Sequence, residues 1–556
     1  MIPSSPDGHG RRSLGPQRAA APGPTRTPGR GVGRSGHPRP TRPRQCAPGL
    51  PGFVLGGLLF LSTLACLAAT PPALSAQTAN LDELASFVEQ ARVDWEVPGL
   101  SVGIIQGDEV VFLQGFGVRD LESGEAVDEH TLFAIGSTSK AFTSAALGIL
   151  VDEERLEWDD RAVDHLPAFR LKDDYVTGAI TVRDLLSHTS GLPRGDRMWY
   201  ASEYDREQVL YRVRYLEPGW GFRERYGYQN IMFLAAGEVV RSLTGQSWDD
   251  FITHRIFRPL GMSRTGTSTL PLAGMSNVAT PHVRVEDRVQ GVAWRNLDNA
   301  GPAGSINSSA AEMLPWLRLH LNGGEHDGVR ILSQEALDEI FTPNNVIRRS
   351  DEQRERVPET HLQSYGLAWR LQDYRGRLWI GHGGAIDGMR AEVALIPELE
   401  LGVVVLSNLG GGSFPTAVMY GIVDRFIGPR DKDWSRVLLD AELESRERAE
   451  ERRAEVEEAR ISGTSPSLPL EAYARAYDQA FHGALVVERE GSGLVARRGP
   501  HVVGDLEHWH HDTFQVRWRD PVLGNAFMTF TVGPRGSVTA VELDPYGTFT
   551  LREDPS

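Results

Sequence analysis

The chain has 556 residues, of which 40% are hydrophobic, and its formal net charge at pH 7 is −16. A chain of this length and hydrophobic content can bury the cores of several domains. Its acidic balance argues against a nucleic acid as a partner, because phosphate backbones bind to basic surfaces.

Residues 1–49 form an extension rich in Arg, Pro and Gly, in which Asp7 is the one acidic residue. Such a composition cannot pack a core, and we expect the extension to be disordered. An apolar run at residues 50–69 follows and ends in small residues up to Ala76. A basic flank, an apolar run and a small-residue end are typical of a secretory signal peptide, here over residues 50–76. An uncleaved helix at residues 50–69 that anchors the protein in a membrane is the alternative.

Cleavage after Ala76 would leave a mature chain without thiols, because Cys46 and Cys66 both precede that point. Disulfide bonds, cysteine nucleophiles and cysteine-ligated zinc are then excluded. Loss of residues 1–76 leaves 49 basic and 73 acidic residues, a net charge of −24. We expect an exported protein, periplasmic or extracellular, that stays at the membrane only if the signal segment is not cleaved.

The first domain predicted for the mature chain, residues 77–428, begins and ends with strand patterns. Residues 98–105 and 109–113 flank a tight turn and predict a β-hairpin. Three further strand-like runs lie far along the chain, at residues 378–381, 390–396 and 401–406. Strands at both ends with helical patterns between them predict one sheet assembled from distant segments.

Two segments follow this domain. Residues 436–460 are dominated by Glu, Arg and Ala, and they predict an exposed helix within a charged linker at residues 429–465. Beyond a break rich in Gly, Ser and Pro, alternating apolar runs indicate a small all-β domain at residues 466–556.

A serine and a lysine three residues apart stand at the start of a helical pattern. Lys140 is one of only three lysines among 58 basic residues. Positions i and i+3 share a helix face, so Lys140 can reach the hydroxyl of Ser137. A buried lysine, unlike an arginine, can lose its proton and act as a base. The structural alternative is a serine that caps the helix and a lysine that faces solvent.

Two further motifs follow in chain order. Tyr228-x-Asn230 leads into a helical pattern, where a helix cap is the alternative role for Asn230. The sequence Gly-His382-Gly383-Gly384-Ala385 comes after an apolar strand pattern, and its glycines let another backbone or a substrate approach.

Taken in order, Ser-x-x-Lys, Tyr-x-Asn and His-Gly-Gly resemble the three motifs of serine β-lactamases and penicillin-binding proteins. The resemblance is closest to the class C β-lactamases with their D-aminopeptidase and esterase relatives, and it covers about residues 80–428. Residues 180–193 and 303–309 resemble signature stretches of that group, and residues after 466 resemble its accessory β domain. The resemblance implies an α/β (α+β) β-lactamase-like fold, in which an antiparallel sheet is flanked by helices and a helical subdomain. It also implies that the small C-terminal all-β domain is barrel-like.

The resemblance implies a role for each motif residue. Ser137 attacks an acyl carbon, Lys140 takes or relays its proton, and Tyr228 serves as base and then as acid toward the leaving group. Asn230 orients Lys140 and a substrate amide. The backbone N–H groups of Ser137 and Ala385 form the oxyanion hole.

His382, which we also count among the catalytic candidates, departs from the β-lactamase pattern, which has a lysine there followed by threonine and glycine. Here the next residues are Gly383 and Gly384, which we expect to line the bound substrate. A largely neutral imidazole and a missing hydroxyl weaken the binding of an antibiotic carboxylate. The histidine form resembles the D-aminopeptidase and D,D-peptidase branch. The resemblance therefore implies a peptidase or amidase, ahead of a carboxylesterase or a β-lactamase.

Three other patterns are interpreted as structural. Ser101 matches G-x-S-x-G, but it lies inside a predicted strand and not at the strand-to-helix turn of a nucleophile elbow. The histidines within residues 508–511 alternate across a strand, so we expect no metal site there. His188 lies near a predicted helix end, where a capping or core role is expected.

The sequence thus predicts an exported serine hydrolase that acts on small peptides, amides or esters and needs no cofactor or metal. The alternative from another class is a catalytically inactive protein that binds a cell-envelope component. Retention of Ser137, Lys140 and Tyr228 together favours the enzyme. The leaving group, the substrate chirality and the oligomeric state stay open.

Overall fold

The computed structural model of the protein describes residues 80–428 and 430–552. The predicted extension at residues 1–49 and the predicted signal segment at residues 50–76 lie outside the described residues. The described residues all belong to one compact unit. Within the described ranges, no helix combines the length and the hydrophobicity that a membrane span requires.

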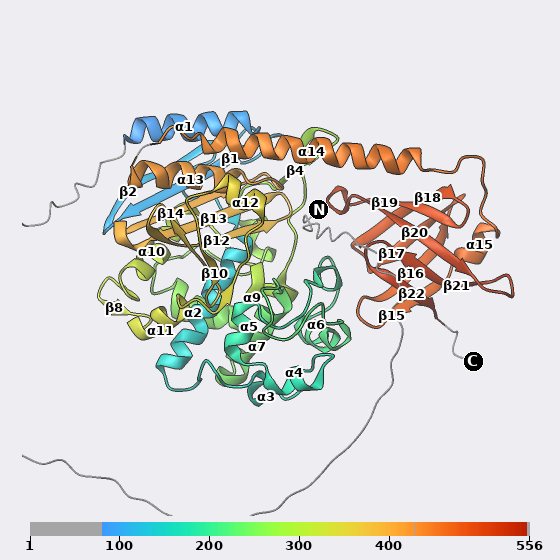
Figure 1. Cartoon of the computed structure of the whole chain (residues 1–556), viewed down its shortest axis with the longest axis horizontal. Coiled ribbons are helices and arrows are strands. Elements are labelled where there is room, and N and C mark those ends of the chain that lie inside the picture. Colours follow the sequence, from blue (N-terminus) through green and yellow to red (C-terminus); the bar gives the residue numbers. More distant parts are fainter. Residues whose placement is uncertain (1–79, 429, 553–556) are drawn as a thin grey trace, which may run out of the picture. The chain divides into compact units, whose positions relative to one another are not determined.

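An eight-stranded antiparallel sheet forms the centre of the first domain (Figure 1). The hairpin from the start of the domain pairs with a strand from its end, so the predicted sheet of distant segments is confirmed. Across the sheet the strands are β2 (Glu109–Gly117), β1 (Gly99–Gln106), β14 (Leu401–Ser407), β13 (Met389–Ile396), β12 (Arg377–Ile386), β11 (Arg370–Tyr374), β10 (Gln363–Tyr365) and β9 (Asn345–Val346).

Both faces of this sheet are covered, as β14 shows most clearly. Every residue of β14 is buried. Val403 and Val405 belong to one hydrophobic core, whereas Val404 and Leu406 belong to the other. Because successive side chains of a strand point to opposite faces, burial on both sides explains the unbroken apolar run in the sequence.

Helices form a layer on each side of the sheet (Figure 1). One core packs α1 (Leu81–Asp94) and α13 (Phe414–Ile427) against the sheet, and the other packs α2 (Ser139–Asp152) and α10 (Ala310–Leu321). A helical subdomain extends the second layer. Its helices are α3 (Ala162–His165), α4 (Asp174–Ala179), α5 (Val182–Ser187), α6 (Arg206–Arg212), α7 (Asn230–Thr244), α8 (Trp248–Ile252) and α9 (Gly301–Gly304).

Short elements complete the first domain. The strands pair as β3 (Phe133–Ala134) with β6 (Asn307–Ser308), β4 (His282–Val285) with β5 (Arg288–Gly291), and β7 (Glu325–His326) with β8 (Val329–Arg330). Two short helices, α11 (Gln334–Ile340) and α12 (Asp351–Arg356), lie between β8 and β10 in the chain.

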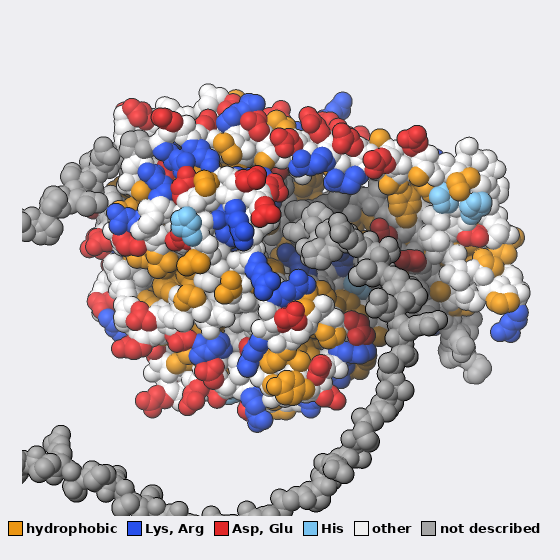
Figure 2. Space-filling view, in the orientation of Figure 1, with side chains coloured by type: hydrophobic (Ala, Val, Ile, Leu, Met, Phe, Trp, Pro, Cys, Tyr) orange, Lys and Arg blue, Asp and Glu red, His pale blue; other side chains and the backbone are white. Residues whose placement is uncertain are grey.

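The predicted charged helix is present as α14 (Trp434–Glu458). Its first turns bury Trp434 and Leu438 against the core that holds α1 and α13. The remainder carries ion pairs four residues apart, such as Arg446 with Glu442, and Figure 2 shows acidic and basic side chains interspersed along it. Such pairs support an exposed helix that has no apolar stripe.

The C-terminal region forms a closed eight-stranded barrel, which confirms the predicted all-β domain. A short helix, α15 (Leu470–Tyr473), precedes it. The alternating residues that predicted strands fill the interior, with the rings of Tyr473, Tyr477, Phe514 and Phe530 in mutual contact. The strands are β15 (Ala476–Gln479), β16 (Gly483–Glu490), β17 (Gly493–Arg498), β18 (Val502–His510), β19 (Thr513–Trp518), β20 (Asn525–Val532), β21 (Val538–Leu543) and β22 (Gly547–Leu551).

Candidate active site

Ser137 lies in a single 3-10 turn, Gly136–Thr138, directly before α2. In the stretch from residue 131 to residue 150 it is the one residue that is not buried. Gly136 has a φ of 53°, and a Cβ at that position would lie 2.7 Å from the Ala385 nitrogen. Only glycine fits this left-handed backbone beside β12. The turn therefore exposes one hydroxyl and brings the backbone of residue 385 close to it.

Lys140 is fully buried, so the solvent-facing alternative is wrong. Its Nζ donates to Ser137 Oγ at 3.1 Å and to the Ala303 carbonyl at 2.6 Å. Among the residues that the structure describes, no carboxylate lies within 4 Å of this nitrogen to form an ion pair. Burial, reinforced by the positive charge of Arg194, holds the pKa of Lys140 well below its ordinary 10.5. The amine is thus placed and tuned to accept the serine proton.

Tyr228 lies above the same two residues. Lys140 Nζ is 4.9 Å from the centre of the Tyr228 ring, and the phenol shares a hydrogen bond with Ser137. Burial raises the pKa of Tyr228 above its usual 10, although the Ser137 bond and Arg194 oppose the rise. The resting phenol is therefore neutral and is a proton donor.

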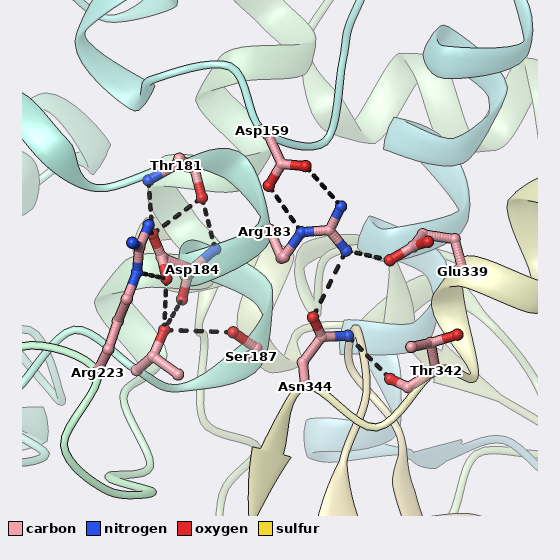
Figure 3. Close-up of polar contacts among 10 residues, drawn as sticks. Asp159, Thr181, Arg183, Asp184, Ser187, Arg223, Glu339, Thr342 and Asn344 are labelled. Atoms are coloured by element: carbon pink, nitrogen blue, oxygen red, sulfur yellow. Dashed lines mark hydrogen bonds and ion pairs between the residues drawn. The ribbon is translucent and has the colours of Figure 1, made fainter. Parts of the chain in front are cut away.

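The loop that carries Tyr228 is anchored by Asp184 (Figure 3). Asp184 accepts two hydrogen bonds from the Arg223 guanidinium, at 2.9 and 2.6 Å, and one from Thr189 Oγ1 at 2.9 Å. It also closes the capping box of α5 with Thr181. The stretch at residues 180–193, which drew attention in the sequence, thus fixes the approach of the chain to Tyr228.

His188 ends α5 in a left-handed conformation and is fully buried, so its predicted capping or core role is confirmed. Its Nδ1 accepts a hydrogen bond from the Gln229 amide at 3.1 Å. Its ring lies 4.3 Å from the Tyr228 ring and 4.7 Å from the Tyr365 ring, centre to centre. His188 therefore packs against Tyr228 and supports the position of its ring.

Asn230 is the first residue of α7, whose N-cap is Gln229. Its Nδ2 donates to Asp196 at 2.9 Å, and no bond to Lys140 is formed. Its Oδ1 is buried without a hydrogen-bond partner among the described residues. The resemblance implied that Asn230 orients Lys140; instead its amide nitrogen is held by a carboxylate, which leaves the oxygen free for a substrate N–H.

His382 is buried within β12 and makes two hydrogen bonds. Because a carbonyl only accepts, Nδ1 carries the proton and donates to Gly383 O at 2.7 Å. Nε2 then accepts from the Tyr365 hydroxyl at 2.9 Å. Burial, together with the charges of Arg370 and Lys140, holds the pKa of His382 well below its usual 6.5. The imidazole is a neutral structural part of the site and presents no charge to a carboxylate.

The Gly-rich segment runs inside β12, which continues to Ile386 and does not end at the histidine. A Cβ on Gly384 would lie 1.9 Å from the Ile135 carbonyl, and a Cβ on Gly383 would lie 2.8 Å from a Glu392 oxygen. These glycines therefore admit the Ser137 turn and neighbouring side chains. Ala385, the next residue, is exposed.

Comparison with known families identifies the first domain. The family model described as Beta-lactamase matches residues 84–422, more than half of the chain. The chain belongs to the β-lactamase family. A second model, described as a domain of unknown function (DUF3471), matches residues 459–554, which include the barrel.

Two relatives within reach of sequence comparison are hydrolytic or penicillin-binding proteins by name. The unguisins hydrolase ungD′ of Aspergillus campestris is 30% identical over 66% of this chain and 69% of its own length. Penicillin-binding protein 4 of Amycolatopsis lactamdurans is 29% identical over 61% of this chain and 88% of its own length. This β-lactamase family member is a serine hydrolase.

Solved structures share the fold. The octameric penicillin-binding protein homologue from Pyrococcus abyssi is 20% identical, with a TM-score of 0.54, over 85% of this chain and all of that one. The D-amino acid amidase from Ochrobactrum anthropi SV3 is 22% identical, with a TM-score of 0.52, over 62% of this chain and 98% of that one. At these identities the likeness establishes the fold alone.

The β-lactamase-family motifs did not reveal four contributors to this site. The Ala303 carbonyl binds Lys140, Tyr365 binds His382, and Arg194 and Asp196 flank Tyr228 and Asn230. Arg194 and Asp196 lie directly after the 180–193 stretch and form an ion pair at 2.7 Å. The sequence signal for them is two opposite charges, two residues apart, beside that stretch. A backbone carbonyl leaves no signal in a sequence.

Of the patterns interpreted as structural, Ser101 lies inside β1 and is buried, as expected. In the barrel, His508 and His510 lie in β18, and His511 follows in a turn with a φ of 47°. The His508 ring bonds the His511 carbonyl.

Proposed function

We propose that the protein is an exported peptidase or amidase of the D-aminopeptidase or D,D-peptidase type, which acts through an acyl-enzyme on Ser137. The observation that carries this proposal is the contact of Lys140 with Ser137 Oγ in a buried position without a carboxylate. A lysine that served only stability would be paired or would reach solvent. The completeness of this pair also speaks against an inactive binding scaffold.

In the acylation step, Ser137 Oγ attacks the acyl carbon and its proton passes to Lys140 Nζ. Lys140 fits this role better than Tyr228, because burial lowers the pKa of the amine but raises that of the phenol. The resemblance left this division open, since it let Lys140 take or relay the proton and Tyr228 serve as base.

Collapse of the tetrahedral intermediate breaks the bond to the leaving group. The neutral Tyr228 gives its proton to the leaving amine, and the Lys140 ammonium passes the former serine proton to the Tyr228 phenolate. A water molecule then attacks the acyl carbon and gives a proton to the neutral Lys140, which passes it to Ser137 Oγ as the acyl bond breaks and the free serine is restored.

The oxyanion is held by the backbone N–H groups of Ser137 and Ala385. Gly136 brings the two segments together, since its missing Cβ is what lets residue 385 approach. Each such donor typically contributes about 3 kcal/mol to stabilisation of the transition state.

Two side chains suggest how a peptide is recognised. Asn230 Oδ1, buried and unpartnered, suits a substrate N–H. Arg370 is exposed, and its guanidinium donates to the Tyr226 hydroxyl at 3.3 Å. It offers a charge to a peptide with a free carboxylate, which the neutral His382 cannot do. The name of the relative in Aspergillus campestris supports hydrolysis, and that of the fold neighbour, a D-amino acid amidase, supports an amide substrate.

A carboxylesterase is the second candidate, because the Lys140 base serves an ester equally well and an alkoxide needs less help from Tyr228 to leave. A β-lactamase is the third, since the neutral His382 offers no charge to the antibiotic carboxylate. Export rests on the signal-peptide pattern at residues 50–76, and cell fractionation with N-terminal sequencing of the mature protein tests it.

The deciding experiment is covalent labelling of the purified protein by a fluorophosphonate, followed by intact mass. One adduct is expected, formed as Ser137 Oγ displaces fluoride from phosphorus, and Ser137→Ala should form none. Ser101→Ala is the matched control, because that serine lies in the same domain but is buried inside β1, and its loss should leave the adduct unchanged. A folded protein that forms no adduct would overturn the proposal.

Turnover then separates the candidates. D-amino-acid amides, D-peptides with a free carboxylate, short esters and β-lactams should be compared by kcat/KM. If the peptide carboxylate meets Arg370, then Arg370→Met raises KM for that substrate class and leaves KM for uncharged amides unchanged. A uniform effect on all substrates would remove Arg370 from substrate recognition.

A further inference from the structure

The segment at residues 194–202 brings two charged groups to the active site. The Arg194 guanidinium lies 4.8 Å from the centre of the Tyr228 ring. Asp196 accepts the hydrogen bond from Asn230 Nδ2 at 2.9 Å. Apart from the single turn Asp196–Met198, the segment has no regular secondary structure to hold it. Its position must therefore be fixed by tertiary contacts.

One arginine of the barrel makes such contacts. Arg498, the last residue of β17, donates to the Met198 carbonyl at 3.4 Å and to the Tyr200 carbonyl at 3.1 Å. Its side chain is only 4% exposed, and its guanidinium lies 5.1 Å from the Tyr546 ring of the barrel. Among the described residues no carboxylate pairs with it within 4 Å.

A buried guanidinium without a counter-ion is a costly way to attach two domains. Apolar packing would dock them with less desolvation, and Phe481 of the barrel already packs into the core of the first domain. What Arg498 adds is direction, because a planar fork that binds two carbonyls two residues apart fixes the path of the backbone.

A second contact runs from the barrel to the other side of the site. Asp520 pairs with Arg295, and Arg295 Nε donates to Asp387 at 2.7 Å. The Tyr200 hydroxyl also donates to Asp387. Asp387 lies in the turn between β12 and β13, two residues after the proposed oxyanion donor Ala385. The barrel therefore contacts the 194–202 segment directly and reaches the β12–β13 turn through Arg295.

We propose that Arg498 and Asp520 of the C-terminal barrel are positioning residues of the hydrolase, which hold the 194–202 segment and the β12–β13 turn in their reactive arrangement. The inference rests on the proposed acyl-enzyme chemistry at Ser137. The barrel acts as a clamp on the site, and neither residue touches the substrate.

The first measurement is hydrogen exchange by mass spectrometry on the purified protein and its Arg498→Met variant. Amides of residues 194–202 should exchange at least tenfold faster in the variant, whereas β1 and β14 should keep their protection. Arg497→Met is the matched control, because the neighbouring Arg497 pairs with Glu488 and Glu490 on the barrel surface. This arm needs no activity, so it decides the clamp even if Ser137 proves unreactive.

The second measurement is the rate of fluorophosphonate labelling at Ser137. Arg498→Met should label about ten- to a hundredfold more slowly, since small misplacements in a catalytic site have effects of that size. Arg498→Lys should recover part of the loss by keeping one carbonyl contact, and Arg497→Met should label at the unaltered rate. If Arg498→Met does not fold, Asp520→Asn provides the test, because Asp520 is partly exposed and its loss should slow labelling several-fold.

A double-mutant cycle separates positioning from general destabilisation. If Arg498 acts through Asp196, then at a pH where labelling no longer rises with pH, Arg498→Met combined with Asp196→Asn labels no more slowly than the slower single variant. Losses that multiply, or exchange of residues 194–202 that does not change in Arg498→Met and Asp520→Asn, would overturn the clamp. If exchange differs between the unaltered protein and Arg498→Met as expected, but the unaltered protein forms no adduct, the proposed function is overturned and the clamp is not.

Discussion

Two buried polar regions of the first domain treat their charges in opposite ways. Around Asp184, which is 4% exposed, every lone pair of the carboxylate is met, by Arg223, by Thr189 and by the capping box of α5 (Figure 3). Lys140 is 0% exposed, yet its partners are only a serine hydroxyl and a backbone carbonyl.

The difference separates a scaffold from a reactive site. A buried charge with a full set of partners stabilises one conformation. A buried amine without a counter-ion has a lowered pKa, because burial disfavours its charged form. The lowered pKa allows the amine to act as a base. Five sets of substitutions bear on this contrast, beginning with the buried lysine and ending with an exposed ion pair.

Replacement of Lys140 should have the largest effect on chemistry. Lys140→Met should reduce the fluorophosphonate labelling rate by about 10³-fold or more, because the proton acceptor is lost. Lys140→Arg should not restore it, since a guanidinium stays protonated.

The same Lys140→Met variant should be more stable than the unaltered protein at neutral pH, by about 1 kcal/mol. A lysine whose pKa falls on folding binds fewer protons in the folded state, so its burial lowers stability at every pH below its ordinary 10.5. The gain should therefore shrink as the pH rises toward that value. Urea unfolding between neutral and alkaline pH measures it, and a variant that is less stable throughout would contradict the idea of an unpaired base.

Tyr228→Phe should retain binding and lose proton donation. We expect labelling and turnover to fall by about 10²-fold, with the larger loss for amides than for esters, because an amine is the poorer leaving group. The ratio of kcat for a matched amide and ester measures this difference. Equal losses would mean that Tyr228 acts only by its shape.

Asp184→Asn tests the scaffold. It removes a charge from a fully bonded cluster and should lower the free energy of unfolding by about 2 kcal/mol. The labelling rate at Ser137 should fall only because the loop that carries Tyr228 becomes more mobile. Urea unfolding gives the stability. A change in the labelling rate that leaves stability untouched would place Asp184 in the chemistry instead.

Arg194 and Asp196 should shift the pH dependence of labelling in opposite directions. The charge of Arg194 lowers the pKa of Lys140 and that of Asp196 raises it. Labelling requires the neutral amine, so the rate rises with pH through that pKa. Arg194→Met should therefore move the rise to higher pH, and Asp196→Asn should move it to lower pH. Rates measured from pH 5 to 10 show both shifts, and shifts of the same sign would rule out direct electrostatic coupling.

An ion pair on α14 should matter least. Arg446→Ala removes a partner of Glu442 on an exposed helix and should change stability by less than about 0.5 kcal/mol. Thermal unfolding provides the measurement. The small change in stability of Arg446→Ala is also the reference against which the loss of stability in Asp184→Asn is judged.

Several features of this protein depend only on residues close together in the chain and could therefore be predicted from the sequence. The tight turn between β1 and β2 and the charged run of α14 each follow from neighbouring residues. The spacing of Ser137 and Lys140 also fixed their contact, because one helical turn brings i and i+3 together. Burial on both faces made β14 a continuous apolar run and made the central sheet predictable.

Other features depend on segments that are distant in the chain. The Ala303 carbonyl that binds Lys140, the Asp196 carboxylate that binds Asn230 and the Tyr365 hydroxyl that binds His382 each come from elsewhere in the sequence. The protonation state of Lys140 was likewise undecided, since a pKa depends on what surrounds a group in space. The sequence by itself determined which residues are candidates for the chemistry and how neighbours pair along one element. Only the tertiary structure decided which charges stay unpaired, because desolvation and long-range hydrogen bonds exist only once the chain has folded.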